Sequence, residues 1–175
     1  MSAFSKFFRN RVRSAILVLV AAASGVVASA GVSNAATTTS TFMVQITISA
    51  SCIINSASTL DFGTQGVLAG NVDQTSAIQV QCTNTTPYNI GLDAGTGVGA
   101  TVATRKMTSG GATVNYSLYT TAGRTTVWGN TVGTDTVSAT GNGAAQSYTV
   151  FGRVPTQTTP APATYSDTIT VTVTY

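Results

Sequence analysis

Alternation of apolar and polar residues in two segments of the 175-residue chain is the feature that most limits its fold. In residues 41–52 the even-numbered positions are apolar or small: Phe42, Val44, Ile46, Ile48, Ala50 and Cys52. In the last part of residues 165–175 the apolar positions are odd-numbered: Ile169, Val171, Val173 and Tyr175. A period of two residues indicates strands with one buried face, because successive side chains of a strand point to opposite sides.

Shorter segments of the same kind lie between these two. We expect strands over 59–63, 76–82, 88–92, 112–119 and 147–154, and a turn over 53–58. Thr, Ala, Val, Gly and Ser dominate the composition, and these residues favour pleated surfaces and turns. Short strands at this spacing predict an all-β sandwich or barrel.

The segment from Gly95 to Gly111 is rich in glycine and has the composition of a phosphate-binding loop. Such a loop needs a following helix whose N-terminal amides face the anion, and residues 112–119 read as a strand. We therefore expect a long surface loop.

The N-terminus has the pattern of an export signal, which we assign to residues 1–35. Lys6, Arg9, Arg11 and Arg13 precede an apolar run from Ala15 to Ala28. This run is shorter than the roughly 20 residues that span a bilayer, and small residues follow it, as cleavage requires. Cleavage after Ala35 is favoured over cleavage after Ala30, and we expect no membrane anchor to remain afterwards.

The charges left after residue 35 exclude some partners. Four basic residues, one adjacent pair among them, stand against five aspartates, for a net charge near minus one. Binding of nucleic acid requires a cluster of positive charge, and attachment to anionic lipid does too. We expect neither as a partner.

Cys52 and Cys82 are the two cysteines of the chain. In an exported protein such a pair is most simply a disulfide. The alternatives, a metal site or a redox pair, lack a histidine partner and the Cys-x-x-Cys spacing. We expect a Cys52–Cys82 disulfide, no metal and no cofactor.

The residue types that carry most enzyme chemistry are scarce. The chain has no His and no Glu, and its five aspartates are scattered, so it lacks the commonest general bases. We predict that the protein is not an enzyme. Trp128, the one tryptophan, has two interpretations: a packed core residue, which we favour, or an exposed platform for a sugar.

The strand expected over 41–52 also has two interpretations. It is either the first strand of the chain's own sheet or a strand offered to another copy of the protein. Alternation alone favours the first, since most alternating strands serve their own core. No residue follows Tyr175, so we expect nothing in the chain to supply a further strand after 165–175.

Five motifs together resemble the spore coat protein U domain family, which includes the pilins of archaic chaperone-usher pili. They are FMVQITISASC at 42–52, LDFG at 60–63, IQVQCT at 78–83, NYSLYTTAGRTTVWGN at 115–130, and YTVFGRVP at 148–155 followed by YSDTITVTVTY. They cover nearly all of the chain after the signal in the family's order.

The resemblance implies an incomplete immunoglobulin-like β-sandwich over residues 51–175 that lacks its final strand, preceded by an N-terminal donor strand segment at 36–50. It implies a donor face of Phe42, Val44, Ile46 and Ile48, and an acceptor groove edge of Ile169, Val171, Val173 and Tyr175. Strand addition of this kind joins subunits through main-chain hydrogen bonds and pocketed side chains. With the resemblance added, the donated strand becomes the favoured interpretation of 41–52.

The family also implies partners and a place of action. These are neighbouring pilin subunits in a homopolymer, a periplasmic chaperone and an outer-membrane usher, with export through the periplasm to a surface fibre that supports adhesion and biofilm formation. Two alternatives stay open: a structural protein of a spore or cyst coat, and a glycan-binding adhesin at a fibre tip that uses Trp128 and the 95–111 loop.

Overall fold

A computed structural model describes residue 31 and residues 34–175. It divides into two units, residues 1–44 and 45–175, each considered by itself. The expected signal peptide therefore lies almost wholly outside the described residues. Residues 34–51 form no strand. In the described part of the chain no helix is long and apolar enough to span a bilayer.

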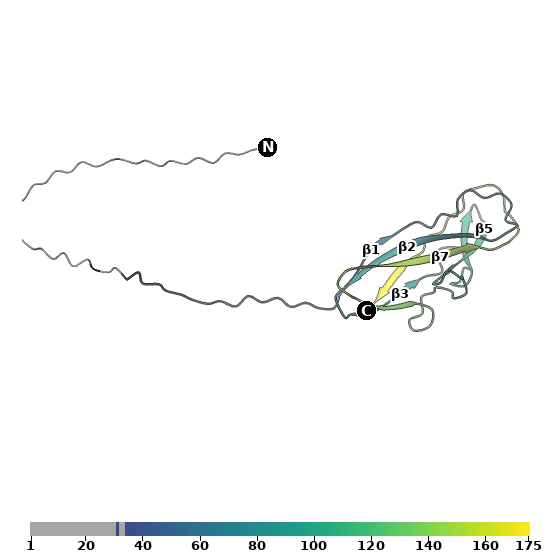
Figure 1. Cartoon of the computed structure of the whole chain (residues 1–175). Coiled ribbons are helices and arrows are strands. Elements are labelled where there is room, and N and C mark those ends of the chain that lie inside the picture. Colours follow the sequence, from purple (N-terminus) through teal and green to yellow (C-terminus); the bar gives the residue numbers. More distant parts are fainter. Residues whose placement is uncertain (1–30, 32–33) are drawn as a thin grey trace, which may run out of the picture. The chain divides into compact units, whose positions relative to one another are not determined.

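Within residues 34–175, eight strands build two antiparallel sheets (Figure 1). They are β1 (Cys52–Ala57), β2 (Val72–Cys82), β3 (Pro87–Leu92), β4 (Arg105–Ser109), β5 (Ala112–Tyr119), β6 (Val137–Thr140), β7 (Ala145–Val154) and β8 (Val171–Thr174). The larger sheet has the order β1-β2-β7-β5-β4, and the smaller has the order β6-β3-β8. The all-β prediction is confirmed.

The core lies between the two sheets. Alternation places the apolar side chains of β5 on the inner face, where Val114, Tyr116 and Leu118 are buried. The side chains of Val80, Tyr88, Ile90 and Leu92 are at most 1% exposed. The long pairing of β2 with β7 runs from Val72 opposite Val154 to Gln81 opposite Ala145 and forms the centre of the larger sheet.

Trp128 belongs to this core, as the favoured interpretation predicted. Its side chain is 1% exposed, and its indole Nε1 donates a hydrogen bond of 2.8 Å to the carbonyl of Ile90. A buried ring with a satisfied N–H has no face left for a ligand. The alternative of Trp128 as an exposed sugar platform is therefore wrong.

The Cys52–Cys82 disulfide is present. The two cysteines lie directly opposite each other where β1 pairs with β2, and their Cα atoms are 4.1 Å apart. In the chain-entropy model, a closed loop of about 30 residues stabilises the folded state by about 3 to 4 kcal/mol. The bond fixes the start of β1 to the end of β2.

The expected turn at 53–58 and the expected strand at 59–63 are both wrong. Residues 53–57 continue β1 and pair with β2 across a bulge between Ile54 and Ser56. Their side chains are exposed, so main-chain pairing and not burial holds them, and no alternating pattern marks them. Residues 58–70 form no strand, and the Asp61 carboxylate accepts a hydrogen bond of 2.8 Å from the Gly63 amide in a tight turn.

Two short strands, β4 and β6, lie where the sequence predicted only loop and turn. β4 forms a hairpin with β5 across Gly110 and Gly111, whose φ angles are +54° and +91°. A Gly-Gly pair between strand segments favours this tight hairpin, because glycine adopts positive φ without strain. The expected final strand over 165–175 is also shorter than predicted, since β8 covers only Val171–Thr174.

Candidate strand-accepting groove

The sandwich is open along one side, between an edge of each sheet. β1 is an edge strand of the larger sheet and β8 is an edge strand of the smaller. Between the sheets lies a cavity of about 440 Å³, whose apolar lining includes Leu60, Phe62, Ile78, Leu92, Met107, Tyr116, Leu118, Val150, Ile169 and Val171. These side chains come from both inner faces, so the cavity is an unfilled part of the core.

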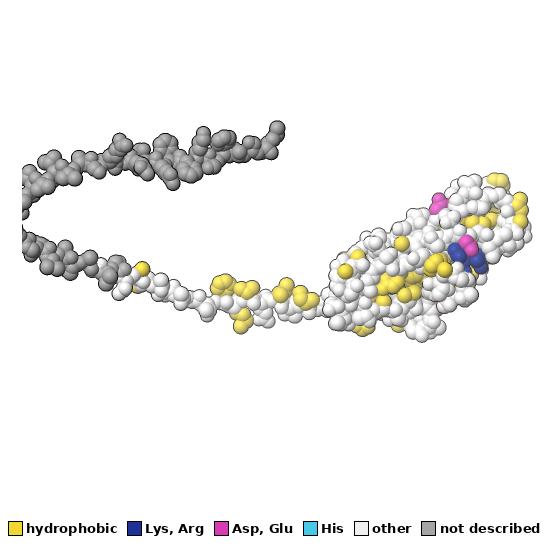
Figure 2. All heavy atoms as spheres, in the orientation of Figure 1, with side chains coloured by type: hydrophobic (Ala, Val, Ile, Leu, Met, Phe, Trp, Pro, Cys, Tyr) yellow, Lys and Arg dark blue, Asp and Glu magenta, His cyan; other side chains and the backbone are white. Residues whose placement is uncertain are grey.

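A second cavity of about 770 Å³ adjoins the first. Both are lined by Leu60, Asp61, Phe62, Met107 and Tyr165, and the second continues over the 63–68 and 159–164 segments. The two together form one trench, called the groove below. Figure 2 shows an elongated patch of apolar side chains on the surface of the domain, with smaller apolar spots around it.

The main chain of β8 has one side free to pair. The amide of Asp93 donates to the carbonyl of Thr170 (3.2 Å), and Gly91 and Asn89 lie opposite Thr172 and Thr174. Each residue of an antiparallel strand directs its N–H and C=O to the same side, and the side alternates along the chain. The main-chain groups of Thr170, Thr172 and Thr174 therefore point to β3, and those of the odd-numbered residues point to the open edge.

The side chains follow the same alternation. Ile169, Val171 and Val173 are partly buried and pack against the core, whereas Tyr175 is 60% exposed. The threonines between them are exposed. The edge thus presents unpaired main-chain groups beside a row of apolar side chains.

Two aspartates hold the segment before β8 in place. The Asp167 carboxylate accepts hydrogen bonds from the Thr96 amide (2.8 Å), the Thr96 hydroxyl (2.9 Å), the Tyr116 hydroxyl (2.8 Å) and the Thr168 amide (2.8 Å). Asp93 Oδ1 accepts from the amides of Gly95 (3.0 Å) and Thr170 (2.9 Å). Burial and the hydrogen bond to Asp167 raise the pKa of Tyr116 above its usual value, so Tyr116 stays a neutral donor to Asp167.

Arg105 is fully buried beside these aspartates, with 0% exposure. Its guanidinium donates to four main-chain carbonyls: those of Asp93 (2.8 Å), Val102 (2.8 Å), Leu92 (3.0 Å) and Trp128 (2.7 Å). Arg105 thus joins the end of β3, at Leu92 and Asp93, to the loops that contain Val102 and Trp128. The sequence offers no signal for this role, since the residue lies in a Gly- and Thr-rich stretch.

Acidification should lower the stability of the fold through Asp93, which holds the segment before β8. Burial alone would raise the pKa of Asp93, but hydrogen bonds from Thr170 and Gly95 and the charge of Arg105 outweigh it and hold the pKa below the usual 3.8. A carboxylate with a depressed folded-state pKa stabilises the fold fully above the unfolded-state value. That contribution is lost as the pH falls from about 3.8 through the folded-state pKa.

We expect the difference in unfolding free energy between the wild-type protein and Asp93→Asn to shrink as the pH is lowered through this window. Denaturant unfolding at a series of pH values measures it. Asp61→Asn, which changes a carboxylate outside this cluster, is the matched control. A difference that stays constant from neutral pH to pH 2.5 would contradict the stabilising role of the Asp93 charge.

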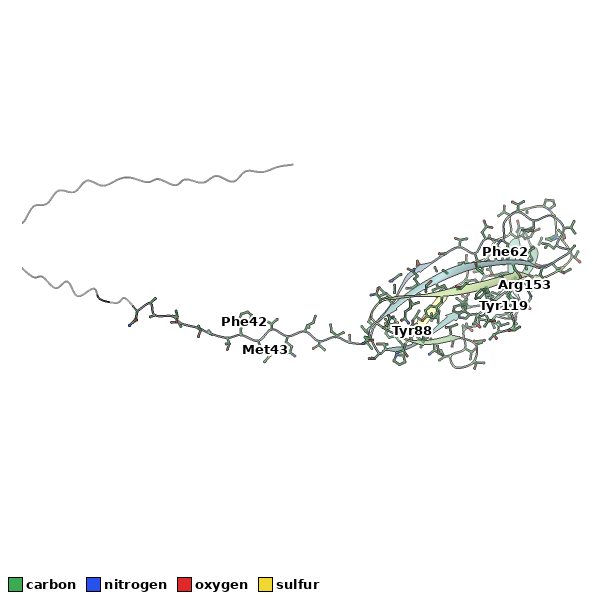
Figure 3. The ribbon with its side chains drawn as sticks, viewed as in Figure 1. Phe42, Met43, Phe62, Tyr88, Tyr119 and Arg153 are labelled. Carbon is green, nitrogen blue, oxygen red and sulfur yellow. A yellow bond between two sulfur atoms is a disulfide. The ribbon has the colours of Figure 1, made fainter. Side chains whose placement is uncertain are left out.

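The four residues predicted to form a donor face are uncovered in this chain. Phe42, Val44, Ile46 and Ile48 are 86%, 84%, 81% and 71% exposed. Phe42 and Met43 project to opposite sides of the extended trace (Figure 3), as in a strand. These residues form no strand of the chain's own sheets, so the interpretation of 41–52 as an ordinary first strand is wrong.

The structure also shows groove residues that sequence reasoning missed. Leu60, Phe62, Met107 and Tyr165 line both cavities of the groove, and Tyr116 lines the smaller one. The LDFG motif at 60–63 contains Leu60 and Phe62, but the strand predicted over 59–63 gave these residues no role in lining a groove. In the part of the chain that the structure describes, no group of three or more His, Cys, Asp or Glu could hold a metal ion.

Comparisons with known proteins show which family and fold the chain resembles. The family model of the spore coat protein U domain matches residues 38–172. Protein U of Myxococcus xanthus is 32% identical over 181 residues, which cover 95% of this chain and 99% of that protein.

A solved structure shares the fold with a TM-score of 0.54 and 23% identity. It is a chain of the CsuC-CsuE chaperone-tip adhesion subunit pre-assembly complex, from the archaic chaperone-usher Csu pili of Acinetobacter baumannii. The match covers 74% of this chain and 41% of the solved chain, so this protein spans less than half of that chain's length. From the extent of the family match and the identity to Protein U, the chain belongs to the spore coat protein U domain family.

Proposed function

We propose that this protein is a structural subunit that polymerises by strand addition. Residues 42–48 of one copy fill the groove of the next and add a strand at the open edge of its sandwich. One observation carries the proposal: the same chain has an apolar groove with an open strand edge and an exposed, alternating apolar segment. The open apolar groove and the exposed apolar segment are each unfavourable in water, and each can bury the other.

The chemistry of the two halves is complementary. Residues 36–51 contain no charged side chain, so they enter an apolar groove without burying an unpaired charge. Burial stabilises each of the four donor side chains by roughly 1.5 to 3 kcal/mol relative to exposure. The open edge of β8 supplies main-chain hydrogen bonds, and alternate side chains occupy the groove, as in other cases of strand addition.

An uncovered groove and strand edge expose a subunit to aggregation before assembly. A periplasmic chaperone that lends a strand until the next subunit replaces it would prevent this, and an outer-membrane usher would be the place of exchange. The Csu complex, which by its description holds a chaperone with a tip adhesion subunit, supports this part of the proposal. The product is a fibre on the cell surface that supports adhesion and biofilm formation.

A spore or cyst coat is the second candidate, favoured by the description of the family as spore coat protein U. The same joint between subunits serves either assembly. Electron microscopy of cells labelled with an antibody to the domain separates the two, because a pilus extends from the surface and a coat follows it.

We expect the assembled protein to form a ladder of bands on a non-reducing denaturing gel if the sample is not heated. Boiling should collapse the ladder to the monomer, because strand-added subunits are joined without covalent bonds and separate when the domain unfolds. Surface extract run heated and unheated measures this. A single monomer band in both lanes would count against polymerisation by strand addition.

A further inference from the structure

Met107 places a thioether sulfur in the lining of the groove. We propose that Met107 is a modification site: a peroxide that enters the open groove oxidises it to methionine sulfoxide, and the sulfoxide keeps a strand from filling the groove. The second step rests on the proposed function, in which residues 42–48 of another copy occupy the groove. Assembly in turn covers Met107 and protects it from oxidation.

The thioethers are the reactive sulfur groups of the exported chain. Both cysteines are joined in the Cys52–Cys82 disulfide, so no thiol is left to oxidise. The chain has three methionines, and Met1 belongs to the expected signal peptide. Met43 and Met107 therefore remain after export. Oxidation to the sulfoxide is a common reaction of methionine, and it takes place where an oxidant can reach the sulfur.

Met107 can be reached from the groove. It lies on the inner face of β4, directly opposite the buried Val114 of β5. The Met107 side chain is only partly buried, and it lines both cavities, of about 440 and 770 Å³. A cavity holds a water molecule once it offers about 10 to 15 Å³, and hydrogen peroxide is only slightly larger than water. Peroxide therefore has room beside Met107 in the folded subunit.

The reaction balances with the peroxide as the oxidant. The lone pair of the thioether sulfur attacks one peroxide oxygen, so an S–O bond forms and the O–O bond breaks. The other oxygen leaves as hydroxide and takes the proton of the transferred oxygen, which gives water. Sulfur loses two electrons and the peroxide gains them. The product replaces a flexible apolar side chain with a polar, chiral one.

The sulfoxide oxygen would lie among groups that cannot satisfy it once a strand is bound. The two tyrosine hydroxyls of the groove lining are already engaged: Tyr116 donates to the Asp167 carboxylate (2.8 Å), and Tyr165 donates to the Ala161 carbonyl (2.8 Å). A strand with an apolar face removes water from the groove and brings no side-chain donor to it. Burying a polar oxygen without a hydrogen bond is unfavourable, so the oxidised groove binds a strand more weakly.

Met43 supplies an internal reference for the reaction. It is 83% exposed, and it projects to the side of the extended segment opposite to Phe42 (Figure 3). When Phe42 faces the groove of another copy, Met43 faces away from that groove. Met43 is therefore open to peroxide both in the single subunit and in the polymer, whereas Met107 is open only in the single subunit.

Peptide mass mapping after treatment with hydrogen peroxide tests the oxidation site. The samples are the wild-type polymer and a full-length variant that cannot donate its segment, Ile46→Asp with Ile48→Asp. We expect Met107 of the variant to react within about tenfold of the rate of Met43, and at least about tenfold faster than Met107 of the polymer. Equal rates at Met107 in the two samples, or no reaction in either, overturn the proposal.

Substitutions at the two methionines test the block on assembly. Cells that export the full-length protein are given hydrogen peroxide until about half of Met43 is oxidised, and the unheated gel measures the polymer. We expect the wild type to lose about fivefold or more of its polymer. Met107→Leu, which nearly conserves volume and has no sulfur, should lose none. Met43→Leu is the matched control, dosed as the wild type, and should lose as much polymer as the wild type.

A polar side chain at position 107 should act without any oxidant. Met107→Gln has a length similar to that of the sulfoxide, and we expect it to form less polymer than Met107→Leu in untreated cells. Equal amounts of polymer from these two variants overturn the block on assembly. A Met107→Leu variant as sensitive to peroxide as the wild type does so too, because the block would then lie elsewhere.

The outcomes separate this site from the proposed function. If the untreated wild-type protein forms no heat-sensitive polymer, the proposed function fails, and the block on assembly fails with it. Mapping of Met107 in the Ile46→Asp, Ile48→Asp variant still decides whether the oxidation site exists. If the polymer forms and peroxide leaves its amount unchanged at the stated dose, the proposed function stands and the role of Met107 is wrong.

Discussion

Replacing Ile46 and Ile48 with aspartate should abolish polymerisation and leave the domain folded. Both side chains are exposed in the single chain, so the substitutions remove nothing from its core. In the joint they would place two carboxylates in an apolar groove, losing roughly 1.5 to 3 kcal/mol of burial for each isoleucine and adding the cost of desolvating a charge. A loss of polymer of more than 100-fold is expected, measured by the unheated gel and by electron microscopy.

The matched control changes the other face of the same segment. Gln45→Asp with Thr47→Asp adds the same charge over nearly the same residues, but its side chains would point away from the groove. We expect this variant to polymerise. If the Gln45→Asp, Thr47→Asp variant also fails to polymerise, added charge and not lost burial blocks assembly. If the Ile46→Asp, Ile48→Asp variant still builds polymer, the assignment of residues 42–48 as the donor is wrong.

The isoleucine variant should also act as a chain terminator. Its groove is unchanged, so it accepts a wild-type donor but cannot donate in turn. Adding it to wild-type protein should shorten the polymers in proportion to its share. A mixture that forms polymers of undiminished length would show that the variant has lost its groove as well, and circular dichroism would then reveal a folding defect.

Arg105→Leu should lower the free energy of unfolding by roughly 4 kcal/mol or more. The guanidinium satisfies four main-chain carbonyls in a site with no exposure, and each buried carbonyl left without a partner costs about 1 to 3 kcal/mol. Leucine supplies none of these donors. Urea unfolding of the wild type and the variant measures the loss.

Two further variants make the test of Arg105 specific. Arg105→Lys keeps the charge but lacks the planar fork that reaches four carbonyls, so its loss should lie between zero and that of leucine. Arg153→Leu removes an arginine, labelled in Figure 3, that pairs with the partly exposed Asp73 at 2.7 Å. An exposed pair contributes about 1 kcal/mol or less, so a loss as large as that of Arg105→Leu would contradict the argument.

Much of the architecture could be predicted from the sequence because it depends on local patterns. The period-two segments at 112–119 and 88–92 became β5 and β3 with nearly the predicted bounds. Burial of one face imposes this period, so the residues themselves carry the information. The disulfide followed from the export signal and an isolated cysteine pair, and the burial of Trp128 was the favoured of its two interpretations.

The errors lie where backbone pairing or a single long-range contact decides the structure. Residues 53–57 pair with β2 although their side chains are exposed, so no burial pattern marks them. Arg105 was invisible as a core residue because its carbonyl partners are dispersed along the chain, from Leu92 to Trp128. No local pattern in a sequence encodes which carbonyls converge on one side chain.

The sequence by itself determined that side chains alternate between apolar and polar along residues 42–48 and 169–175, which gives each segment one apolar face. The tertiary structure decided what those faces meet. It packs Ile169, Val171 and Val173 beside an unfilled core and leaves Phe42, Val44, Ile46 and Ile48 outside the sheets of their own chain. The reason is physical: alternation specifies that a face must be buried, but only the packed sandwich shows where a cavity is left unfilled.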